Sequence, residues 1–402
     1  MRVEIFKGKA KGTVVAPPSK SMAHRNLICA ALSEKSQLSS VAFSEDILAT
    51  IDCLKELGAS IEKRGDKVIL GGLEPTAAKE AVLNCGESGS TLRFLLPLCL
   101  LCDREITLVG STRLMQRPMT VYREIFEEKG ISFYQDDKCI KVKGKLVGGE
   151  FKVDGSVSSQ FISGLLFALP LLKQDSVIKI EGELQSQSYL KLTLWSLKAF
   201  GIRIDSSDIR SIKVFGGQHY ESKNMIVEGD YSNSAFFSAF NFLGGDVDIK
   251  GLDAHSLQGD KVYLDIMPKL YQEKTVVSLA DCPDLGPILF ALASTGKGAI
   301  FTDTARLRIK ESDRVECMEK ELKKFGVKMD VQENCVIIHP GELHTPTEHL
   351  YGHNDHRIVM AVSVLATLTG GIIDGAQAVA KSFPDFFERL EEVGIKVKKY
   401  EA

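Results

Sequence analysis

One order of secondary-structure elements recurs about six times along this sequence of 402 residues. Each copy opens on small, hydroxyl or charged residues, continues into a nearly all-apolar helix and a strand, and closes with a second helix and a hairpin. The copy that opens at Cys85 has an apolar helix to Leu101, a strand at 105–109, a second helix ended by Gly130 and a hairpin at 131–142. Helices that are apolar on every side are buried on every side, so the pattern predicts helices inside and sheets outside.

The repeats group into two halves. Later copies open at Gly86, Gly155, Gly229, Cys282 and His353, with uneven spacing and a short fourth copy. Solenoid repeats are usually about 20–50 residues long, and most of these are longer, which favours compact domains over an extended array. We therefore predict two similar α/β domains, each made of about three repeats.

A discontinuous domain follows from the incomplete first repeat. The boundary between the halves falls near residues 224–228, and the first dozen residues are left to pair with the C-terminal half. The prediction is one domain of residues 1–12 plus 228–402 and another of residues 13–227. The chain would cross between them twice and form a hinge, with helix N-termini from both halves facing an active-site cleft.

Composition narrows the class of function. The net charge is −3, which argues against a general nucleic-acid binder. The nine cysteines form no C-x-x-C pair and lack zinc-ligand spacing with histidines, so we expect reduced, mostly buried thiols and no metal site. No apolar run reaches the roughly 18 residues of a membrane span, and the first residues lack the apolar core of a secretory signal. These features predict a soluble cytoplasmic protein.

Cations at expected helix starts indicate an anion site. Residues 17–25 read Pro-Pro-Ser-Lys-Ser-Met-Ala-His-Arg, which puts a lysine and an arginine where a helix begins. The eight cations placed in this way are Lys20, Arg25, Arg93, Arg117, Lys310, Arg314, Arg357 and Lys381. A helix N-terminus disfavours a cation, and two cations about 6 Å apart repel by roughly 3 kcal/mol at an effective dielectric near 20. Solvated basic residues beside ordinary caps would explain one such site, but eight favour a polyanionic small molecule bearing phosphates and carboxylates.

Two carboxylates stand beside these cations. Asp284 precedes an apolar helix, and Glu311 lies between Lys310 and Arg314, so both are candidates for proton transfer. Asp284 could equally be a helix N-cap, and Glu311 could pair with Arg314 three residues along. The sequence has no G-x-x-x-x-G-K-[ST], which disfavours a P-loop nucleotide site, and its single tryptophan offers no platform for stacking bases.

Five motifs, in the same order, resemble those of the 5-enolpyruvylshikimate-3-phosphate synthases (3-phosphoshikimate 1-carboxyvinyltransferases), a family of enolpyruvyl transferases. They are Ser19-Lys20-Ser21 with Arg25, residues 154–161 (DGSVSSQF), 310–314 (KESDR), 354–357 (NDHR) and 381–385 (KSFPD). The resemblance implies transfer of the enolpyruvyl group of phosphoenolpyruvate to the 5-hydroxyl of shikimate 3-phosphate, with release of phosphate, in the route to chorismate and aromatic amino acids. It also implies an inside-out α/β barrel fold, in which two domains of three βαβαββ-type units close on substrate.

The resemblance also implies roles for residues, position by position. The shikimate 3-phosphate side comprises Lys20, Ser21, Arg25, Ser158, Ser159, Gln160, Ser186, Tyr189, Asp284 and Lys310. The phosphoenolpyruvate side comprises Lys20, Gly89, Arg117, Gln160, Arg314, Arg357 and Lys381. Much of the first set falls in residues 13–227 and much of the second in the discontinuous domain. Glu311 would protonate the enol methylene, and Asp284 or Lys20 would handle the proton of the 5-hydroxyl, so no metal or redox cofactor is required.

Two positions depart from the family pattern, and two other functions stay open. The segment that usually reads Asn-Ala-Gly-Thr is Glu87-Ser88-Gly89-Ser90, and Arg306 replaces an asparagine or acidic residue. The sister transferase that acts on UDP-N-acetylglucosamine would carry a cysteine in the loop at 113–117, which has none. A non-catalytic phosphometabolite-binding protein could use the same cations. We expect a monomer whose partners are the two substrates, with no nucleic acid and no membrane.

Overall fold

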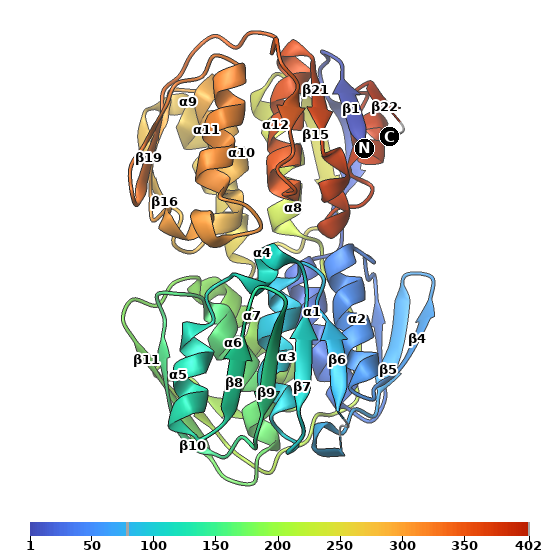
Figure 1. The fold of residues 1–402 in the computed structure, drawn as a ribbon. Coiled ribbons are helices and arrows are strands. Elements are labelled where there is room, and N and C mark those ends of the chain that lie inside the picture. Colours follow the sequence, from blue (N-terminus) through green and yellow to red (C-terminus); the bar gives the residue numbers. More distant parts are fainter. Residues whose placement is uncertain (78–79, 401–402) are drawn as a thin grey trace. The chain divides into compact units, whose positions relative to one another are not determined.

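The chain forms two compact units (Figure 1). The computed structural model describes residues 1–77 and 80–400. Unit 1 comprises Met1–Pro17 and Glu228–Ala402, and unit 2 comprises Pro18–Val227. The sequence put the first crossing after residue 12, which would cut β2 (Lys11–Val15). This strand pairs in parallel with β15 (Asp246–Lys250), and the pairing keeps the chain in unit 1 beyond the predicted boundary.

The repeated order is strand, helix, strand, helix, strand, strand, and among the described residues it builds five four-stranded sheets and one two-stranded sheet. In a full repeat the first strand pairs in parallel with the second. The fourth strand lies between the second and the third and pairs antiparallel with both. The second repeat has η1 (Pro75–Ala77) before it and consists of β6 (Ala81–Asn84), α3 (Gly89–Cys99), β7 (Ile106–Val109), α4 (Thr112–Met115), α5 (Thr120–Glu128), β8 (Ser132–Gln135) and β9 (Cys139–Lys143). The third consists of β10 (Gly149–Asp154), α6 (Ser159–Ala168), η2 (Leu169–Leu171), β11 (Ser176–Glu181), α7 (Gln187–Ala199), β12 (Ile204–Asp205) and β13 (Ser211–Val214).

The two repeats next to the crossings each take their opening strand from a distant part of the chain. The first repeat, in unit 2, consists of β14 (Asn224–Ile226), α1 (Lys20–Leu32), β3 (Ser36–Ser39), α2 (Glu45–Glu56), β4 (Ser60–Arg64) and β5 (Lys67–Gly71). The fourth, in unit 1, consists of β2, α8 (Tyr231–Ala239), η3 (Phe240–Phe242), β15, η4 (Gly259–Val262) and α9 (Tyr263–Gln272). Its sheet has two strands, which accounts for the short fourth copy in the sequence.

The start of the chain completes the last repeat of unit 1. The fifth repeat consists of β16 (Thr275–Ser278), η5 (Pro283–Leu285), α10 (Gly286–Thr295), β17 (Ala299–Thr302), η6 (Ala305–Ile309), α11 (Arg314–Lys324), β18 (Met329–Val331) and β19 (Cys335–Ile338). The sixth consists of β20 (Leu350–Tyr351), α12 (His356–Thr369), β21 (Gly371–Asp374), η7 (Ala376–Lys381), α13 (Phe386–Glu392), β22 (Val397–Tyr400) and β1 (Arg2–Ile5). Strand β1 pairs antiparallel with both β21 and β22, in the position of the fourth strand.

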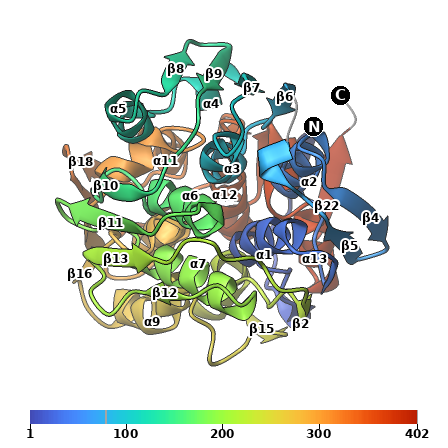
Figure 2. The same cartoon turned by 90° about the horizontal axis from the view of Figure 1, so that it is seen from below.

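Helices lie inside each unit and sheets lie outside, as the sequence predicted. In unit 2, α3 and α6 are buried along nearly their whole length. Figure 2 shows α1, α3 and α6 with strands of the same unit arranged around them. In unit 1, α10 and α12 are buried in the same way. The apolar side chains form two separate cores, one in each unit.

Local signals set the helix bounds. Ser19 caps α1 by accepting from Met22 N, and Ser158 caps α6 by accepting from Gln160 N. Gly130 and Gly326 follow α5 and α11 with φ values of 69° and 85°, a conformation that non-glycine residues rarely adopt. The helix start within residues 17–25 and the stop at Gly130 are the ones that the sequence predicted.

Candidate active site

The candidate residues divide between the two units. Unit 2 carries Lys20, Ser21, Arg25, Gly89, Arg117, Ser158, Ser159, Gln160, Ser186 and Tyr189. Unit 1 carries Asp284, Lys310, Glu311, Arg314, Arg357 and Lys381. Each set therefore draws residues from more than one repeat.

Arg314 is the centre of the unit 1 set. It is the first residue of α11 and its side chain is only 1% exposed. Its Nε donates to Asp355 Oδ2 over 2.8 Å, and its Nη2 donates to Glu311 Oε2 over 2.7 Å. Its Nη1 donates to Asp284 Oδ1 over 2.9 Å. Burial alone would lower the pKa of this guanidinium, but the three carboxylates outweigh burial and hold the pKa above its usual range.

Asp284 joins three cations. Besides Arg314, its carboxylate lies 3.0 Å from Arg357 Nη2 and 3.5 Å from Lys310 Nζ. It belongs to η5, and the N-cap position of α10 is taken by Leu285, so the alternative role as that cap is not what the structure shows. Burial alone would raise the Asp284 pKa, but the cations hold it well below its usual value. The group is therefore a carboxylate, the form that accepts a proton.

Asp355 is a member of this cluster that the sequence did not single out. Its side chain is fully buried, and besides binding Arg314 it caps α12 by accepting from Arg357 N over 3.0 Å. Ser312 Oγ donates to its Oδ2 over 3.0 Å. The available signal was its position in the 354–357 motif, directly before an apolar helix.

Lys310 has a lowered pKa. Burial lowers its pKa to about 8; Arg314 and Arg306 act in the same direction, while Asp284 and Glu311 oppose them. Arg306, one of the two departures from the family pattern, therefore lies close enough to influence Lys310 electrostatically. Its Nη1 also donates to Ala280 O over 3.5 Å, a long contact.

Lys381 contacts the backbone of the 354–357 motif. Its Nζ donates to Asn354 O over 2.5 Å, and its side chain is buried. The sequence placed Lys381 at the start of the last helix, and this prediction is wrong. The residue ends η7, and α13 begins only at Phe386, beyond Pro384.

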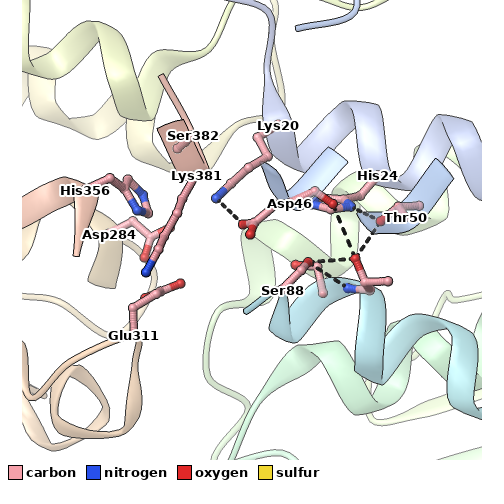
Figure 3. Close-up of polar contacts among 12 residues, drawn as sticks. Lys20, His24, Asp46, Thr50, Ser88, Asp284, Glu311, His356, Lys381 and Ser382 are labelled. Atoms are coloured by element: carbon pink, nitrogen blue, oxygen red, sulfur yellow. Dashed lines mark hydrogen bonds and ion pairs between the residues drawn. The ribbon is translucent and has the colours of Figure 1, made fainter. Parts of the chain in front are cut away.

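Lys20 is held by a carboxylate that sequence reasoning missed. It is the first residue of α1, and its Nζ lies 2.7 Å from Asp46 Oδ2 (Figure 3). Both side chains are mostly buried, with exposed fractions of 16% for Lys20 and 12% for Asp46. Asp46 lies in the first turn of α2, where a carboxylate is favoured by the helix dipole. The pair thus links the starts of the first two helices of unit 2.

A buried polar chain connects these helices to α3. His24 Nδ1 lies 2.8 Å from Thr50 Oγ1, which lies 2.6 Å from Thr91 Oγ1 (Figure 3). Thr91 donates to Ser88 Oγ over 2.7 Å, and Ser88 caps α3 directly before Gly89. Burial holds the His24 pKa well below its usual value, so the imidazole is neutral. These linked hydrogen bonds therefore order Glu87-Ser88-Gly89-Ser90, the segment that departs from the Asn-Ala-Gly-Thr of the family pattern.

Arg25 is buried between α1 and α7. Its Nε donates to Thr193 Oγ1 over 2.9 Å, and its Nη2 donates to Tyr189 O over 3.0 Å. Its Nη1 donates to Ser21 O over 2.7 Å, and its guanidinium lies over the Phe94 ring. Burial lowers the Arg25 pKa to about 10, which still leaves a full positive charge at neutral pH. Arg25 thus contacts two other predicted residues, Ser21 and Tyr189.

Ser158, Ser159 and Gln160 form the start of α6. The Gln160 side chain accepts from Arg93 Nη1 over 2.7 Å and donates to Ser90 Oγ over 3.0 Å. Ser186 occupies the corresponding position before α7, with a left-handed backbone (φ 55°) and a buried side chain. The serines thus lie at two helix N-termini, whose backbone N–H groups favour anions.

Gly89 lies against Arg117. A Cβ added at Gly89 would lie 2.5 Å from Arg117 Nη1, so only glycine leaves the guanidinium where it is. Arg117 lies between α4 and α5, before Pro118, rather than in the first turn of a helix as predicted. The residue preceding a proline is disfavoured in helical conformation. The same correction applies to Lys310, which follows η6 and precedes α11.

Arg25 and Arg93 also lie beyond the first turns of their helices, α1 and α3. Lys20, Arg314 and Arg357 do lie in the first turn of a helix, as predicted. The cations are nevertheless buried or partly buried rather than solvated, and burying a charge costs free energy unless the charge is paired and hydrogen-bonded. An arrangement that combines cations, carboxylates and helix N-termini is suited to bind anions and transfer protons.

Other classes of site receive no support from the described residues. Within residues 1–77 and 80–400, no group of three or more His, Cys, Asp or Glu side chains is placed to hold a metal ion. No helix in these ranges combines the length and apolar character needed to cross a membrane. All nine cysteines are free thiols, and all but Cys139 and Cys335 are buried, as predicted.

Comparisons with known proteins identify relatives over the whole chain. A family described as EPSP synthase (3-phosphoshikimate 1-carboxyvinyltransferase) matches residues 6–390. A 3-phosphoshikimate 1-carboxyvinyltransferase of Clostridium perfringens is 40% identical over 98% of each chain. The protein of the same name from Clostridium kluyveri is 39% identical over 99% of this chain and 98% of its own.

The fold has counterparts among solved structures. An EPSP synthase from Acinetobacter baumannii superposes with a TM-score of 0.80 and covers 99% of this chain and 100% of its own. The two sequences are 23% identical, so this likeness bears on the fold alone. It agrees with the inside-out arrangement of helices and sheets in both units.

Proposed function

The chain belongs to the EPSP synthase family, and we propose that the residues gathered in its two units make up one enolpyruvyl transferase active site. The chain transfers the enolpyruvyl group of phosphoenolpyruvate to the 5-hydroxyl of shikimate 3-phosphate and releases phosphate, in aromatic amino acid biosynthesis. The observation that carries the site assignment is the cluster in which buried Arg314 binds Asp284, Glu311 and Asp355.

Unit 2 provides most of the proposed contacts to shikimate 3-phosphate. Ser158 and Ser159 at the start of α6, with Ser186 at the start of α7, bind the phosphate. Helix N-termini favour phosphate because their first N–H groups lack partners within the helix. Arg25, Tyr189 and Gln160 contact the carboxylate, ring and hydroxyls. Lys20 and Ser21 belong to the same side.

Unit 1 provides most of the proposed contacts to phosphoenolpyruvate. Arg314, Arg357 and Lys381 bind its phosphate and carboxylate, aided by Lys20, Arg117, Gly89 and Gln160 from unit 2. Arginine suits this task because its planar fork pairs with both oxygens of a carboxylate or phosphate. Asp284 and Lys310, from unit 1, extend to shikimate 3-phosphate.

Proton transfer falls to Glu311, Asp284 and Lys20. Glu311 protonates the methylene carbon of phosphoenolpyruvate, and positive charge develops at C2. The 5-hydroxyl adds to C2 while Asp284, kept as a carboxylate by its cations, or Lys20 takes the hydroxyl proton. Glu311, now a carboxylate, then takes a proton back from the methyl group of the tetrahedral intermediate as the bond from C2 to the phosphate oxygen breaks. This elimination restores the enol double bond, and the surrounding cations stabilise the charge of the released phosphate.

The family match favours this reaction over the one on UDP-N-acetylglucosamine. We further propose a cytoplasmic monomer, because both substrates are small soluble metabolites and each repeat's sheet is completed within the same chain. Light scattering of the purified protein tests the monomer, and a mass twice that of one chain would contradict it.

Replacing Glu311 with Gln tests the site assignment. Loss of a general acid lowers turnover by about 10²–10⁴-fold, and calorimetric binding of shikimate 3-phosphate should persist. Glu316→Gln, in an exposed pair with Lys320, is the matched control and should leave both quantities unchanged. A Glu311→Gln enzyme with wild-type turnover would contradict the role of Glu311. A non-catalytic binding protein would show binding without turnover in the wild type as well.

A further inference from the structure

Two adjacent non-glycine residues adopt left-handed backbone conformations directly before α12. His353 has φ 47° and Asn354 has φ 53°. Non-glycine residues adopt this conformation uncommonly, and they keep it when the surrounding contacts fix the backbone. The turn leads into Asp355, the N-cap of α12.

This turn presents two groups to the cation cluster of unit 1. Asn354 O accepts from Lys381 Nζ, and the Asp355 carboxylate accepts from Arg314. A turn with ordinary backbone angles would point the Asn354 carbonyl elsewhere. The positions of Lys381 and Arg314 therefore depend on what holds residues 353 and 354.

Glu321, near the C-terminal end of α11, holds the segment that enters the turn. Its side chain is 1% exposed, and its Oε1 lies 2.8 Å from His353 Nε2. Its Oε2 accepts from Tyr351 N over 2.9 Å and lies 2.8 Å from Lys324 Nζ. Lys324 also donates to His349 O over 2.9 Å. A single buried carboxylate thus fixes the chain at three points over residues 349–353.

We propose that Glu321 and His353 are positioning residues for phosphoenolpyruvate, which act by holding the left-handed turn that places Lys381 and Arg314. This inference rests on the proposed roles of those two cations. Neither Glu321 nor His353 belongs to the motifs or to the set of substrate contacts. Their effect is expected on phosphoenolpyruvate rather than on shikimate 3-phosphate, whose main contacts lie in unit 2.

The pair is charged at neutral pH. Burial alone would lower the His353 pKa, but hydrogen bonds with Cys317 and Glu321 outweigh burial and raise it to about 9. The Tyr351 ring also faces the imidazole, with the ring centroids 5.0 Å apart, and Lys324 of α11 pairs with the same Glu321 carboxylate. A raised histidine pKa means that the stabilisation is complete below the ordinary value near 6.5 and is lost as the pH rises through about 9. The turn should therefore loosen in alkaline solution.

Steady-state kinetics of His353→Asn test the proposal, because asparagine tolerates a left-handed backbone but cannot form the ion pair. We expect the KM for phosphoenolpyruvate to rise about tenfold. This is the lower end of the loss in affinity that follows when a residue that orients a metal ligand is removed. The KM for shikimate 3-phosphate should change less than twofold. In the wild type the KM for phosphoenolpyruvate should rise above about pH 9, as His353 loses its proton. The KM of the variant should not show this rise.

Controls separate positioning from a general structural effect. Glu321→Gln should reproduce the His353→Asn kinetics, and the double variant should be no worse than either single variant. His339→Asn, which removes a similar histidine pair with Asp330 (2.6 Å) in unit 1, should leave both KM values unchanged. Equal KM values for phosphoenolpyruvate in His353→Asn and wild type would overturn the proposal.

A measurement on the unmodified protein covers the case in which the variants fold poorly. Imidazole NMR signals should include a histidine that titrates near pH 9, and a His353 signal that titrates near 6.5 would overturn the proposal. If the wild type itself releases no phosphate in the presence of both substrates, the proposed function fails instead. The two failures are therefore distinguishable.

Discussion

Arg314 Nε donates to Asp355 Oδ2 over 2.8 Å, and the two side chains are 1% and 0% exposed. The pair joins the first residue of α11 to the N-cap of α12, so the starts of these two helices of unit 1 are held together. Asp284 and Glu311 bind the same guanidinium from other directions. The Arg314 side chain therefore both stabilises the fold and makes a proposed contact with substrate.

Asp355→Asn should destabilise the fold. The change keeps the shape of the side chain but removes its charge, and breaking a buried ion pair costs about 3–5 kcal/mol. We expect the lower end of that range because Arg314 keeps two other carboxylates. The midpoint of guanidinium unfolding, followed by circular dichroism, measures the effect. Asp248→Asn, in an exposed pair with Lys250, should cost less than about 1 kcal/mol, and equal losses in both variants would contradict the account.

Asp46→Asn should impair turnover more than stability. Lys20 would lose the carboxylate 2.7 Å away that orients its ammonium group. Displacing a group that positions a reacting substrate can cost about a hundredfold in rate, so kcat/KM should fall by about that factor. The unfolding midpoint should shift little because both side chains keep some contact with solvent. A variant with unchanged kcat/KM would show that Asp46 does not position Lys20.

The charge of Lys310 should limit activity in alkaline solution. With a pKa of about 8, this lysine is charged below that pH and becomes neutral as the pH rises through it. Since kcat/KM reports groups of the free enzyme, kcat/KM for shikimate 3-phosphate should decrease above about pH 8. Lys310→Arg should move the decrease to higher pH because arginine stays charged. If kcat/KM decreases at the same pH in this variant as in the wild type, a group other than Lys310 causes the decrease.

Gly89→Ala should weaken phosphoenolpyruvate binding without unfolding the protein. The added methyl group would lie 2.5 Å from Arg117 Nη1, at the end of a flexible side chain that has to move. We expect a KM for phosphoenolpyruvate about tenfold higher, equivalent to about 1.4 kcal/mol, and a nearly unchanged unfolding midpoint. Gly341→Ala, where nothing lies within 4 Å of the added atom, is the control. A similar KM in both variants would contradict the proposed role of Arg117.

Local sequence signals predicted much of the fold. Ser19 and Ser158 cap helices, and Gly130 and Gly326 end them, through contacts within a few residues. The apolar opening helices predicted burial on every side, and the structure buries them. The pairing of β14 with the first repeat was beyond such signals, because its partner β3 lies nearly two hundred residues earlier in the chain.

The candidate site divides in the same way. Its cations were identified from the sequence because they recur in unusual places. Asp284 and Glu311 were identified beside them, but two other carboxylate partners were not, since Asp46 lies 26 residues from Lys20, and Asp355 lies 41 residues from Arg314. The helical placement predicted for Arg117 and Lys381 is wrong because nearby prolines delay the helix that follows.

Release of inorganic phosphate from phosphoenolpyruvate, measured with and without shikimate 3-phosphate, tests the enolpyruvyl transfer most directly. Expulsion of phosphate follows addition of the 5-hydroxyl, so release should require shikimate 3-phosphate. Shikimate without its phosphate should be a poor substitute, because it lacks the group that Ser158, Ser159 and Ser186 are proposed to bind. The account predicts release only when both substrates are present, and equal rates with and without shikimate 3-phosphate would contradict it.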